Sequence, residues 1–386
     1  MIVEPRIKGF ICTTAHPLGC SENVDRQIAY VKEKGSCKGP KKVLVIGSST
    51  GYGLASRIMA TFGCGADTLG VMYEREATEK RTASPGWYNT IHFEKKAHAA
   101  GFYAKTINKD AFLKETKEEV FTEIEQSLGK IDMVIYSLAA PRRTTSDGQV
   151  FQSVLKPLNE KFTEKSWNLT TNEITEATIE PATPQELLET VKVMGGEDWQ
   201  EWIDGLLERK LLNENAMTIA YSYIGPELTY PVYYNGTIGM AKKQLQETAE
   251  SLNKRHETSG LQAYISVNKA LVTQASSAIP IVPLYFALLY KVMKEKTLHE
   301  GCIEQAERLF REKLGENQVV TDEERRIRVD DLEMRPDVQE ETMRRWNLVN
   351  TDNLEEYADV KGYWDDFYHM FGFGFDNINY EEDVEI

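Results

Sequence analysis

Short apolar runs alternate with stretches of helical character over the first 140 residues of the chain. The runs cover residues 43–46, 68–73, 102–107 and 131–136, and each has the length of a buried strand. A helical pattern occupies residues 114–128. Strands that alternate with helices in this way predict an α/β fold, a Rossmann-type doubly wound parallel sheet with helices on both faces.

The alternation stops at residue 142 and returns near residue 217. Between these points, residues 168–179 alternate like a hairpin, and residues 184–212 have a mostly helical pattern. An insertion of about 75 residues is unusual as a plain loop. We therefore interpret residues 142–216 as a lid or subdomain on the substrate side.

The sheet is predicted to resume at residues 217–223, before a helix over residues 236–256 and another strand within residues 261–273. Residues 297–386 are predicted to form a mainly helical C-terminal extension. The first 40 residues are a mixed lead-in with a loop at residues 35–40. We see no internal repeat, and we expect one enlarged Rossmann-type domain over residues 1–386.

A glycine-rich turn follows the first predicted strand. The sequence Gly47-Ser48-Ser49-Thr50-Gly51-Tyr52-Gly53 ends the apolar run and precedes a helix-compatible stretch. In such a turn, backbone N–H groups and the positive end of the helix point at one spot, which suits a pyrophosphate. The glycines leave room for the turn and for the phosphate. Their spacing, Gly-x3-Gly-x-Gly, differs from the commonest dinucleotide fingerprint.

An acidic residue ends the second predicted strand, where a dinucleotide fold needs one. Glu74 lies 21 residues after Gly53, and its carboxylate is placed to bind the adenosine ribose hydroxyls. It would repel a 2′-phosphate, which favours NADH, whereas Arg75 beside it could accept that phosphate. Nucleotide contacts are expected at the carboxyl ends of the strands, which are Gly47, Glu74, Asp110 and Leu138.

Composition narrows the classes of function. The 386 residues are 41% hydrophobic and 27% charged, with a net charge of −15. So acidic a surface is a poor partner for nucleic acid or an anionic membrane, and an anionic substrate needs local basic residues. The five scattered cysteines suit reduced thiols rather than a zinc site. The first residues do not resemble a signal peptide, and we expect a cytoplasmic protein without a metal, a monomer or small homo-oligomer.

Tyrosines gather before the helix predicted from residue 236. They are Tyr221, Tyr223, Tyr230, Tyr233 and Tyr234, and Lys242 and Lys243 follow inside the helix. A tyrosine hydroxyl can stabilise or protonate an oxyanion, and a nearby lysine can bind the cofactor ribose. Tyr233 and Lys242 would face opposite sides of one regular helix, so Tyr233 can meet Lys242 only from the preceding turn. Spacing does not choose between Tyr233 and Tyr234.

Long motifs along essentially the whole chain carry a resemblance to a known family. They cover residues 9–17, 47–53, 63–71, 136–143, 194–199, 272–280, 299–305 and 371–374. Through them the chain resembles the trans-2-enoyl-CoA reductases, or FabV-type enoyl-ACP reductases, which are enlarged relatives of the short-chain dehydrogenase/reductases. The family's Tyr-x8-Lys signature falls on Tyr233 and Lys242. This implies Tyr233 as the catalytic acid, Lys242 as the catalytic and cofactor-binding lysine, and Tyr223 as a substrate contact.

The resemblance also implies NADH as the cofactor and a set of residues that bind it. These residues lie in the glycine turn, at later strand ends and on the helix after the tyrosines: Gly47, Ser48, Ser49, Thr50, Gly51, Tyr52, Tyr73, Glu74, Asp110, Ala111, Leu138, Ala139, Lys242, Leu271, Val272 and Thr273. The implied reaction reduces a trans-2-enoyl thioester, as in fatty-acid or butyrate-type metabolism. Hydride goes to C3, and Tyr233 with Tyr223 binds the enolate oxygen. Neither a metal nor a flavin is needed.

Several alternatives remain open. The substrate is an enoyl-CoA such as crotonyl-CoA or an enoyl group on acyl-carrier protein, and the acidic composition favours CoA. A carbonyl (3-ketoacyl) reductase on the same fold is a second function, although the Tyr–Lys spacing is wider than the usual Tyr-x3-Lys. A non-catalytic NADH-binding protein is a third. Residues 278–296, apolar and then basic, are either a wall of an acyl pocket or an ordinary core helix.

Overall fold

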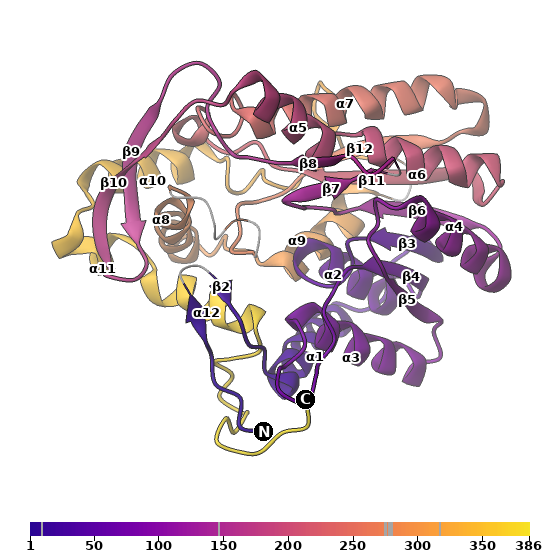
Figure 1. Ribbon diagram of the computed structural model, residues 1–386, viewed down its shortest axis with the longest axis horizontal. Coiled ribbons are helices and arrows are strands. Elements are labelled where there is room, and N and C mark those ends of the chain that lie inside the picture. Colours follow the sequence, from indigo (N-terminus) through magenta and orange to yellow (C-terminus); the bar gives the residue numbers. More distant parts are fainter. Residues whose placement is uncertain (9–10, 146, 274–275, 277–280, 316–317) are drawn as a thin grey trace.

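The computed structural model (Figure 1) describes residues 1–386 apart from residues 9–10, 146, 274–275, 277–280 and 316–317. Its centre is a seven-stranded parallel sheet in the order β13-β12-β11-β6-β3-β4-β5. The strands are β3 (Lys42–Ile46), β4 (Asp67–Met72), β5 (Ala104–Asn108), β6 (Ile131–Tyr136), β11 (Leu212–Ser222), β12 (Gln262–Val267) and β13 (Arg326–Arg328). The predicted α/β fold is confirmed.

The strand order reverses between β3 and β6. The chain runs outward from β3 through β4 to β5, and then returns to β6 on the other side of β3. In open parallel sheets such a reversal opens a crevice at the carboxyl ends of the strands, where ligands bind. The glycine-rich turn lies directly after β3, and therefore stands at this crevice.

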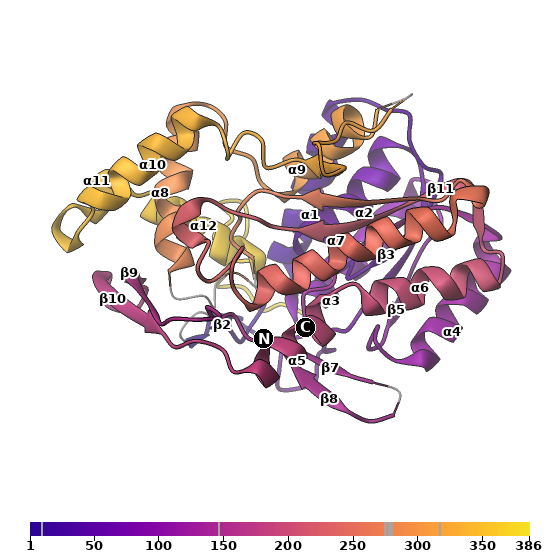
Figure 2. The ribbon, with the colours of Figure 1, turned by 90° about the horizontal axis from the view of Figure 1, so that it is seen from above.

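Alternate residues of β3 pack into two separate cores, because successive side chains of a strand point to opposite faces. Val43 and Val45 share a core with α1 (Pro17–Glu33), α2 (Gly51–Ile58), α3 (Pro85–Ala99) and α9 (Cys302–Arg308). Leu44 and Ile46 share the other core with α4 (Lys114–Glu123), α6 (Glu197–Glu208) and α7 (Thr237–Arg255). Figures 1 and 2 show the sheet between these two helical layers.

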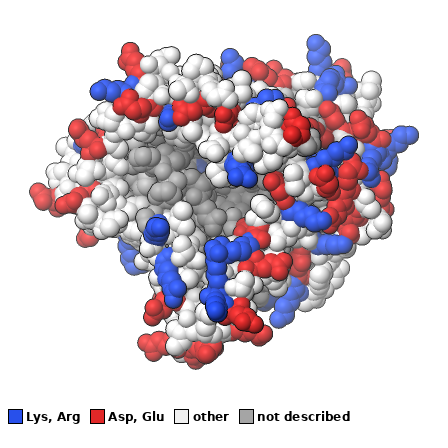
Figure 3. Space-filling view, in the orientation of Figure 1, with Lys and Arg blue, Asp and Glu red and all other residues white. Residues whose placement is uncertain are grey.

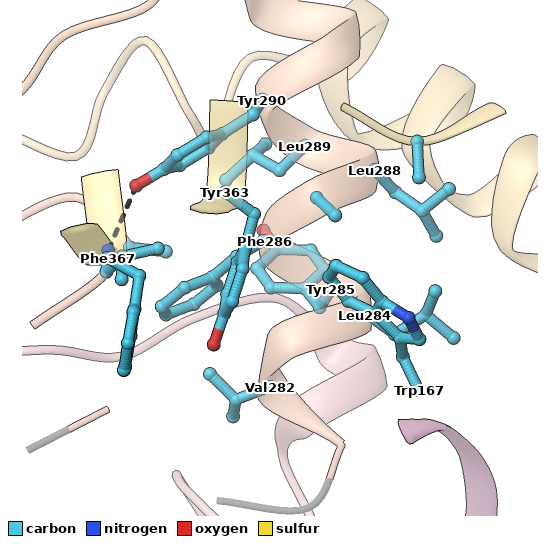
Figure 4. Packing of buried hydrophobic residues seen from close by; sticks show 14 of the residues in the cluster. Trp167, Val282, Leu284, Tyr285, Phe286, Leu288, Leu289, Tyr290, Tyr363 and Phe367 are labelled. Carbon is cyan, nitrogen blue, oxygen red and sulfur yellow. Dashed lines mark hydrogen bonds between the residues drawn. The ribbon is translucent and has the colours of Figure 1, made fainter. Parts of the chain in front are cut away.

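A third core surrounds α8 (Val282–Glu295), which is buried along nearly its whole length. Helices α10 (Pro336–Leu348), α11 (Leu354–Tyr357) and α12 (Val360–Met370) contribute to it. Figure 4 shows Trp167, Tyr363 and Phe367 gathered around the α8 side chains. A helix that is apolar on all sides is a buried core element. Over its described residues the segment therefore fits the core-helix interpretation, while residues 278–280 lie outside the described part.

The segment between β6 and β11 forms two hairpins and two helices. The hairpins pair β7 (Arg142–Thr144) with β8 (Val150–Gln152), and β9 (Phe162–Asn168) with β10 (Glu173–Ile179). The predicted hairpin is thus present but begins at Phe162. Helix α5 (Pro184–Met194) follows it, and α6 then packs Trp199 and Trp202 into the core beneath the sheet.

Three elements differ from the sequence-based expectation. The lead-in contains α1, whose apolar positions Val24, Ile28 and Val31 follow helical spacing and pack against α2. The strand β11 begins at Leu212, because an irregular register before Met217 lengthens it. Strand β13 is only three residues long and was not predicted. A short hairpin, β1 (Ile7–Lys8) with β2 (Ile11–Cys12), begins the chain. None of the helices in the described ranges has the length and apolarity to cross a membrane.

Candidate active site

The glycine turn is packed tightly between the ends of β3 and β6. Gly47 has φ +84°, and a Cβ there would lie 2.6 Å from the Ser137 carbonyl oxygen. A Cβ on Gly53 would lie 1.8 Å from the Gly47 carbonyl oxygen. Both clashes are with backbone, which side-chain movement cannot relieve. Gly51 differs, because its φ is +53° and the nearest atom to a Cβ is Thr273 Cγ2 at 3.9 Å.

A cavity of about 220 Å³ lies against the open side of this turn. Its lining includes Thr50 and Gly51 at the start of α2, the segment 271–273 after β12, and Asn89 on α3. Among the described residues, no side chain caps the first turn of α2. The amide groups of a helix start attract anions, and the cavity therefore fits a pyrophosphate against α2.

The Glu74 carboxylate is fixed in place beside the glycine turn. The Ser49 hydroxyl donates to its Oε1 (2.6 Å), and the Asn108 side chain makes two hydrogen bonds with the Glu74 backbone, at 2.7 and 2.9 Å. A Cβ on Gly86 would lie 2.2 Å from the same carboxylate oxygen, so a side chain at that position of α3 would displace the carboxylate. The Arg75 guanidinium turns instead toward the Thr82 carbonyl oxygen (3.5 Å).

The other predicted cofactor residues lie at the ends of neighbouring strands. Asp110 follows β5, and its carboxylate accepts the Phe112 amide (2.9 Å) beside buried Ala111. After β6, Leu138 is half-buried and Ala139 is exposed. The side chain of Tyr73, at the end of β4, is 79% exposed.

Burial separates the two candidate tyrosines. Tyr233 lies in the turn before α7, is 9% exposed, and packs edge-on against Tyr223 with ring centroids 5.1 Å apart. Tyr234 is 49% exposed and lies against Tyr230. Burial raises the pKa of Tyr233, which keeps its hydroxyl protonated and able to donate at neutral pH.

Lys242 connects the tyrosines to the glycine turn. It is half-buried on α7, its Nζ donates to the Tyr221 carbonyl oxygen (3.1 Å), and Lys243 is exposed. The Tyr221 hydroxyl shares a hydrogen bond with Ser56 on α2, and its ring packs against Tyr52. Burial lowers the pKa of Lys242 to about 8. Tyr221 therefore links the two elements, since its carbonyl oxygen accepts Lys242 and its hydroxyl bonds α2, the helix that begins at the glycine turn.

One buried acid at this end of the site was not predicted from the sequence. Glu333 is 0% exposed, and its Oε1 accepts hydrogen bonds from the hydroxyls of Tyr285 (2.8 Å) and Tyr223 (3.3 Å). It lies 110 positions after Tyr223. No local pattern could have revealed this pairing, because only the tertiary fold brings the two residues together.

These features define a nicotinamide-dependent reductase of the Rossmann class. They are the glycine turn at the sheet reversal, the acid after the next strand, and the buried tyrosine with a lysine. Comparisons with known proteins narrow the class. Residues 81–315 match the model of the trans-2-enoyl-CoA reductase catalytic region, and residues 2–79 match the NAD(P)H-binding domain of trans-2-enoyl-CoA reductase. The chain belongs to the trans-2-enoyl-CoA reductase family.

Full-length relatives agree with this membership. The chain is 52% identical to the trans-2-enoyl-CoA reductase [NADH] of Ruminiclostridium cellulolyticum, over 100% of the chain and 98% of that relative. It is 56% identical to an enoyl-[acyl-carrier-protein] reductase [NADH] of Coxiella burnetii, over 100% of the chain and 96% of the relative. The crystal structure of Treponema denticola trans-2-enoyl-CoA reductase in complex with NAD superimposes with a TM-score of 0.96 at 48% identity, covering 100% and 98% of the two chains.

Residues 321–384 match a third model, described as an enoyl reductase FAD-binding domain. Two of the three glycines in this segment are packed closely, unlike an open glycine cradle for a nucleotide. A Cβ on Gly372 would lie 2.5 Å from the His16 carbonyl oxygen, one on Gly362 would meet the Asp359 carboxylate, and one on Gly374 would contact the His369 ring. Gly362 and Gly372 are thus packed closely against protein atoms, whereas Gly374 makes only ordinary van der Waals contact. The segment instead packs aromatic side chains around α8 and supplies Glu333.

Proposed function

We propose that the protein is an NADH-dependent reductase that converts trans-2-enoyl thioesters to saturated acyl thioesters. The observation that carries this proposal is the packing of buried Tyr233 against half-buried Tyr223, together with Lys242 on the following helix. Relatives along the full length of the chain are named as reductases of enoyl-CoA or enoyl-acyl-carrier protein with NADH. Buried Tyr233 offers a hydrogen-bond donor for the negative charge that such a substrate develops.

The proposed chemistry needs a hydride and a place for negative charge. Bound NADH supplies the hydride, which goes to C3 of the conjugated thioester. Charge then builds on the thioester oxygen, and we assign Tyr233 as the group that donates a hydrogen bond to that enolate oxygen. Burial raises the pKa of Tyr233 and so keeps the donor protonated. A single donor of this kind typically contributes about 3–4 kcal/mol to transition-state stabilisation.

Lys242 is assigned to the cofactor. Its ammonium group is held by the Tyr221 carbonyl oxygen, next to the helix that carries the glycine turn. In this position it can donate to a ribose hydroxyl and add positive potential near the substrate oxygen. The segment Leu271, Val272 and Thr273 forms the opposite wall of the cavity at the glycine turn. The Val272 amide is held by the Tyr290 hydroxyl (2.9 Å).

Glu74 is assigned as the group that selects NADH. The Ser49 hydroxyl holds the carboxylate and the Asn108 side chain holds the Glu74 backbone, so that the carboxylate lies beside the glycine turn, where it can accept hydrogen bonds from ribose hydroxyls. A 2′-phosphate in the same place would meet a negative charge. Arg75 is directed toward Thr82 and away from that role.

We assign residues 142–216 to the substrate side of the single enlarged domain. Support comes from two contacts with the start of α7, just after Tyr233. The Thr237 amide donates to the Lys156 carbonyl oxygen (3.0 Å), and the Thr237 hydroxyl donates to the Val154 carbonyl oxygen (2.6 Å). The inserted segment thus bonds to the start of α7, next to the turn that carries Tyr233. Residues 297–386 form the C-terminal extension, which supplies α9 to the sheet core and Glu333 to the tyrosines.

The acyl carrier and the cellular setting complete the proposal. Figure 3 shows Lys and Arg side chains gathered in the lower centre of one face of an otherwise mixed surface. Such a basic region suits the phosphates of CoA as well as an acidic carrier protein, and we propose CoA as the carrier.

The five cysteines are free thiols, which suits a reducing cytoplasm. We propose a monomer or small homo-oligomer there.

A substrate panel tests the function. NADH oxidation is followed with crotonyl-CoA, crotonyl-acyl-carrier protein and acetoacetyl-CoA, each under the same conditions. Turnover of crotonyl-CoA and little turnover of acetoacetyl-CoA supports the proposal. Preference for acetoacetyl-CoA would identify a carbonyl reductase, and no NADH oxidation with any of the three would leave a binding protein. A higher kcat/KM on the protein-bound substrate than on crotonyl-CoA would overturn the choice of carrier alone.

A further inference from the structure

The Glu333 carboxylate lies between the two halves of the site. Its Oε1 accepts the hydroxyl protons of Tyr223 and Tyr285, and its Oε2 accepts the Ala270 amide (2.6 Å). Tyr223 packs against Tyr233, and Ala270 immediately precedes the segment 271–273 that lines the cavity at the glycine turn. A single side chain therefore bonds both Tyr223, which packs on Tyr233, and Ala270, which adjoins the segment assigned to the cofactor.

A carboxylate in this position is unfavourable unless donors compensate for the lost water. Glu333 is fully buried, and burial raises its pKa, whereas the positive charge of Lys269 and the hydrogen bonds from Ala270 and Tyr285 oppose that rise. Lys269 is itself buried, with its Nζ bonded to the Ala270 carbonyl oxygen (3.0 Å) and placed over the Tyr290 ring. Buried polar groups with several partners hold their neighbours in one geometry.

Glu333 is held at its backbone as well as at its carboxylate. Its backbone carbonyl accepts the Gln339 side chain (2.7 Å) from α10, and Tyr285 projects from the buried helix α8 (Figure 4). The carboxylate cannot shift without breaking these contacts. The direction of the Tyr223 hydroxyl is therefore determined by a group that lies outside the tyrosine cluster itself.

Resting on the proposed function, we infer that Glu333 is a positioning residue of the reaction, which orients Tyr223 against Tyr233 and fixes the strand end at Ala270. Tyr223 uses its single hydroxyl hydrogen in the hydrogen bond to the carboxylate. The Tyr223 oxygen can therefore only accept further hydrogen bonds in this arrangement. Tyr233 is then the tyrosine of the pair that is free to donate to the substrate oxygen. Tyr223 acts by holding the ring of Tyr233 and the acyl group in place.

A double-mutant cycle tests this role. The kcat and the KM for crotonyl-CoA are measured at saturating NADH for wild type, Glu333→Gln, Tyr223→Phe and the double variant. A hydrogen bond to a charged group is strong enough that each single substitution should lower kcat by about tenfold or more. At saturating NADH the contact with Ala270 should have little effect on kcat, so that Glu333 acts on kcat through the Tyr223 hydroxyl. The double variant should then fall no more than about twofold below Tyr223→Phe, as expected for coupled residues.

A matched control separates positioning from general destabilisation. Glu300 is another buried carboxylate of the C-terminal part, paired with Arg308 and bonded to Gln305. Glu300→Gln should lower the thermal midpoint and leave kcat within about twofold, since it removes a structural ion pair. If Glu333→Gln does not fold, Glu333→Asp takes its place in the cycle. Its charge is kept, but the shorter side chain cannot reach Tyr223 and Ala270 together.

The outcomes are distinct. An unchanged kcat in the Glu333 variant, or an equal fractional loss with and without the Tyr223 hydroxyl, would overturn the inference. So would an equal loss of kcat in Glu300→Gln. A wild-type protein that is inactive on crotonyl-CoA would reject the proposed function, whereas an active wild type with uncoupled variants would reject only the role of Glu333.

Discussion

The glycine turn and the tyrosine cluster are held in place by different kinds of contact. At the glycine turn, backbone packs on backbone, and the missing side chains of Gly47 and Gly53 let the ends of β3 and β6 approach. At the tyrosine cluster, side chains bond to side chains, and Tyr223, Tyr285 and Glu333 come from three distant segments. The first arrangement should fail as a whole when altered, whereas the second should lose catalysis while the fold survives.

The largest effect is expected where the glycine turn meets β6. Gly47→Ala should reduce the free energy of unfolding by about 1–2 kcal/mol through its positive φ, and by roughly 1–3 kcal/mol more through overpacking on Ser137. Gly101→Ala is the matched control, since Gly101 has φ +85° and open space around its Cβ position. Denaturant unfolding of the two variants measures the difference. Equal destabilisation would show that the contact with Ser137 carries no weight.

Gly47 and Gly51 should respond differently to a side chain. From sequence alone, valine at position 47 or 51 would be expected to abolish NADH binding and spare the fold. In the structure Gly51 comes closer to that description than Gly47, because its Cβ position is open toward the cavity and meets no backbone atom. Gly51→Val should lose NADH affinity, and its φ of +53° should lower the thermal midpoint, but by less than the same change at Gly47, which adds the clash with Ser137.

Within the tyrosine cluster, removal of one hydroxyl should affect turnover alone. Tyr233→Phe is expected to lower kcat by roughly 10² or more, about 2.7 kcal/mol, because it deletes the donor to the enolate oxygen. NADH affinity and unfolding should change little. Tyr234→Phe, at the exposed neighbour, should keep near-normal turnover. The reverse result would mean that the two tyrosines had been assigned the wrong way round.

The preference between NADH and NADPH tests the role assigned to Glu74 beside the glycine turn. We expect kcat/KM with NADH to exceed that with NADPH by at least tenfold, about 1.4 kcal/mol. Glu74→Ala should narrow the gap, because it removes the charge that repels the 2′-phosphate. Arg75→Ala should leave the ratio nearly unchanged. Equal efficiency with both cofactors in the wild type would show that Arg75 or another base dominates.

The smallest effect is expected from titration of Lys242, which follows the tyrosine cluster and is assigned to the cofactor at the glycine turn. Burial lowers its pKa to about 8, so that the ammonium form dominates at neutral pH and is lost as the pH rises through that value. The KM for NADH should therefore rise above pH 8. Lys242→Met should show a raised KM and a lower kcat at all pH values, with a flatter profile. Wild-type kinetics in this variant would make Lys243 the next candidate.

The part of the site that sequence predicts is the part built from neighbouring residues. The turn from Gly47 to Gly53, the acid at Glu74 and the strand ends follow from local patterns, because each strand leads directly into its own contact residues. The choice of Tyr233 over Tyr234 from residues alone was not possible, since it depends on how the turn before α7 faces the core. Glu333 was missed because nothing near it in the chain indicates its partner.

The same distinction holds for the fold. The strands β3, β4, β5 and β6 were predicted to within a few residues. In β3, β4 and β6 nearly every residue is buried and the runs are short and apolar, whereas β5 at the edge of the sheet is buried only at Ala104 and Ile107. Strand β13 has three residues, two of them arginine, so no apolar run in the sequence marks it. It is recognised only by its pairing with β12 at the edge of the sheet. Helix α1 had an amphipathic pattern that a closer count of helical spacing would have found.

The most direct test of the central claim follows the hydride itself. Crotonyl-CoA is reduced in ordinary water with NADH that carries deuterium at both C4 positions, and the product is examined by mass spectrometry and NMR. The account predicts butyryl-CoA with one deuterium at C3 and none at C2, because hydride from NADH goes to C3 and the C2 proton comes from protein or solvent. A product without deuterium, or one labelled at C2, would contradict it.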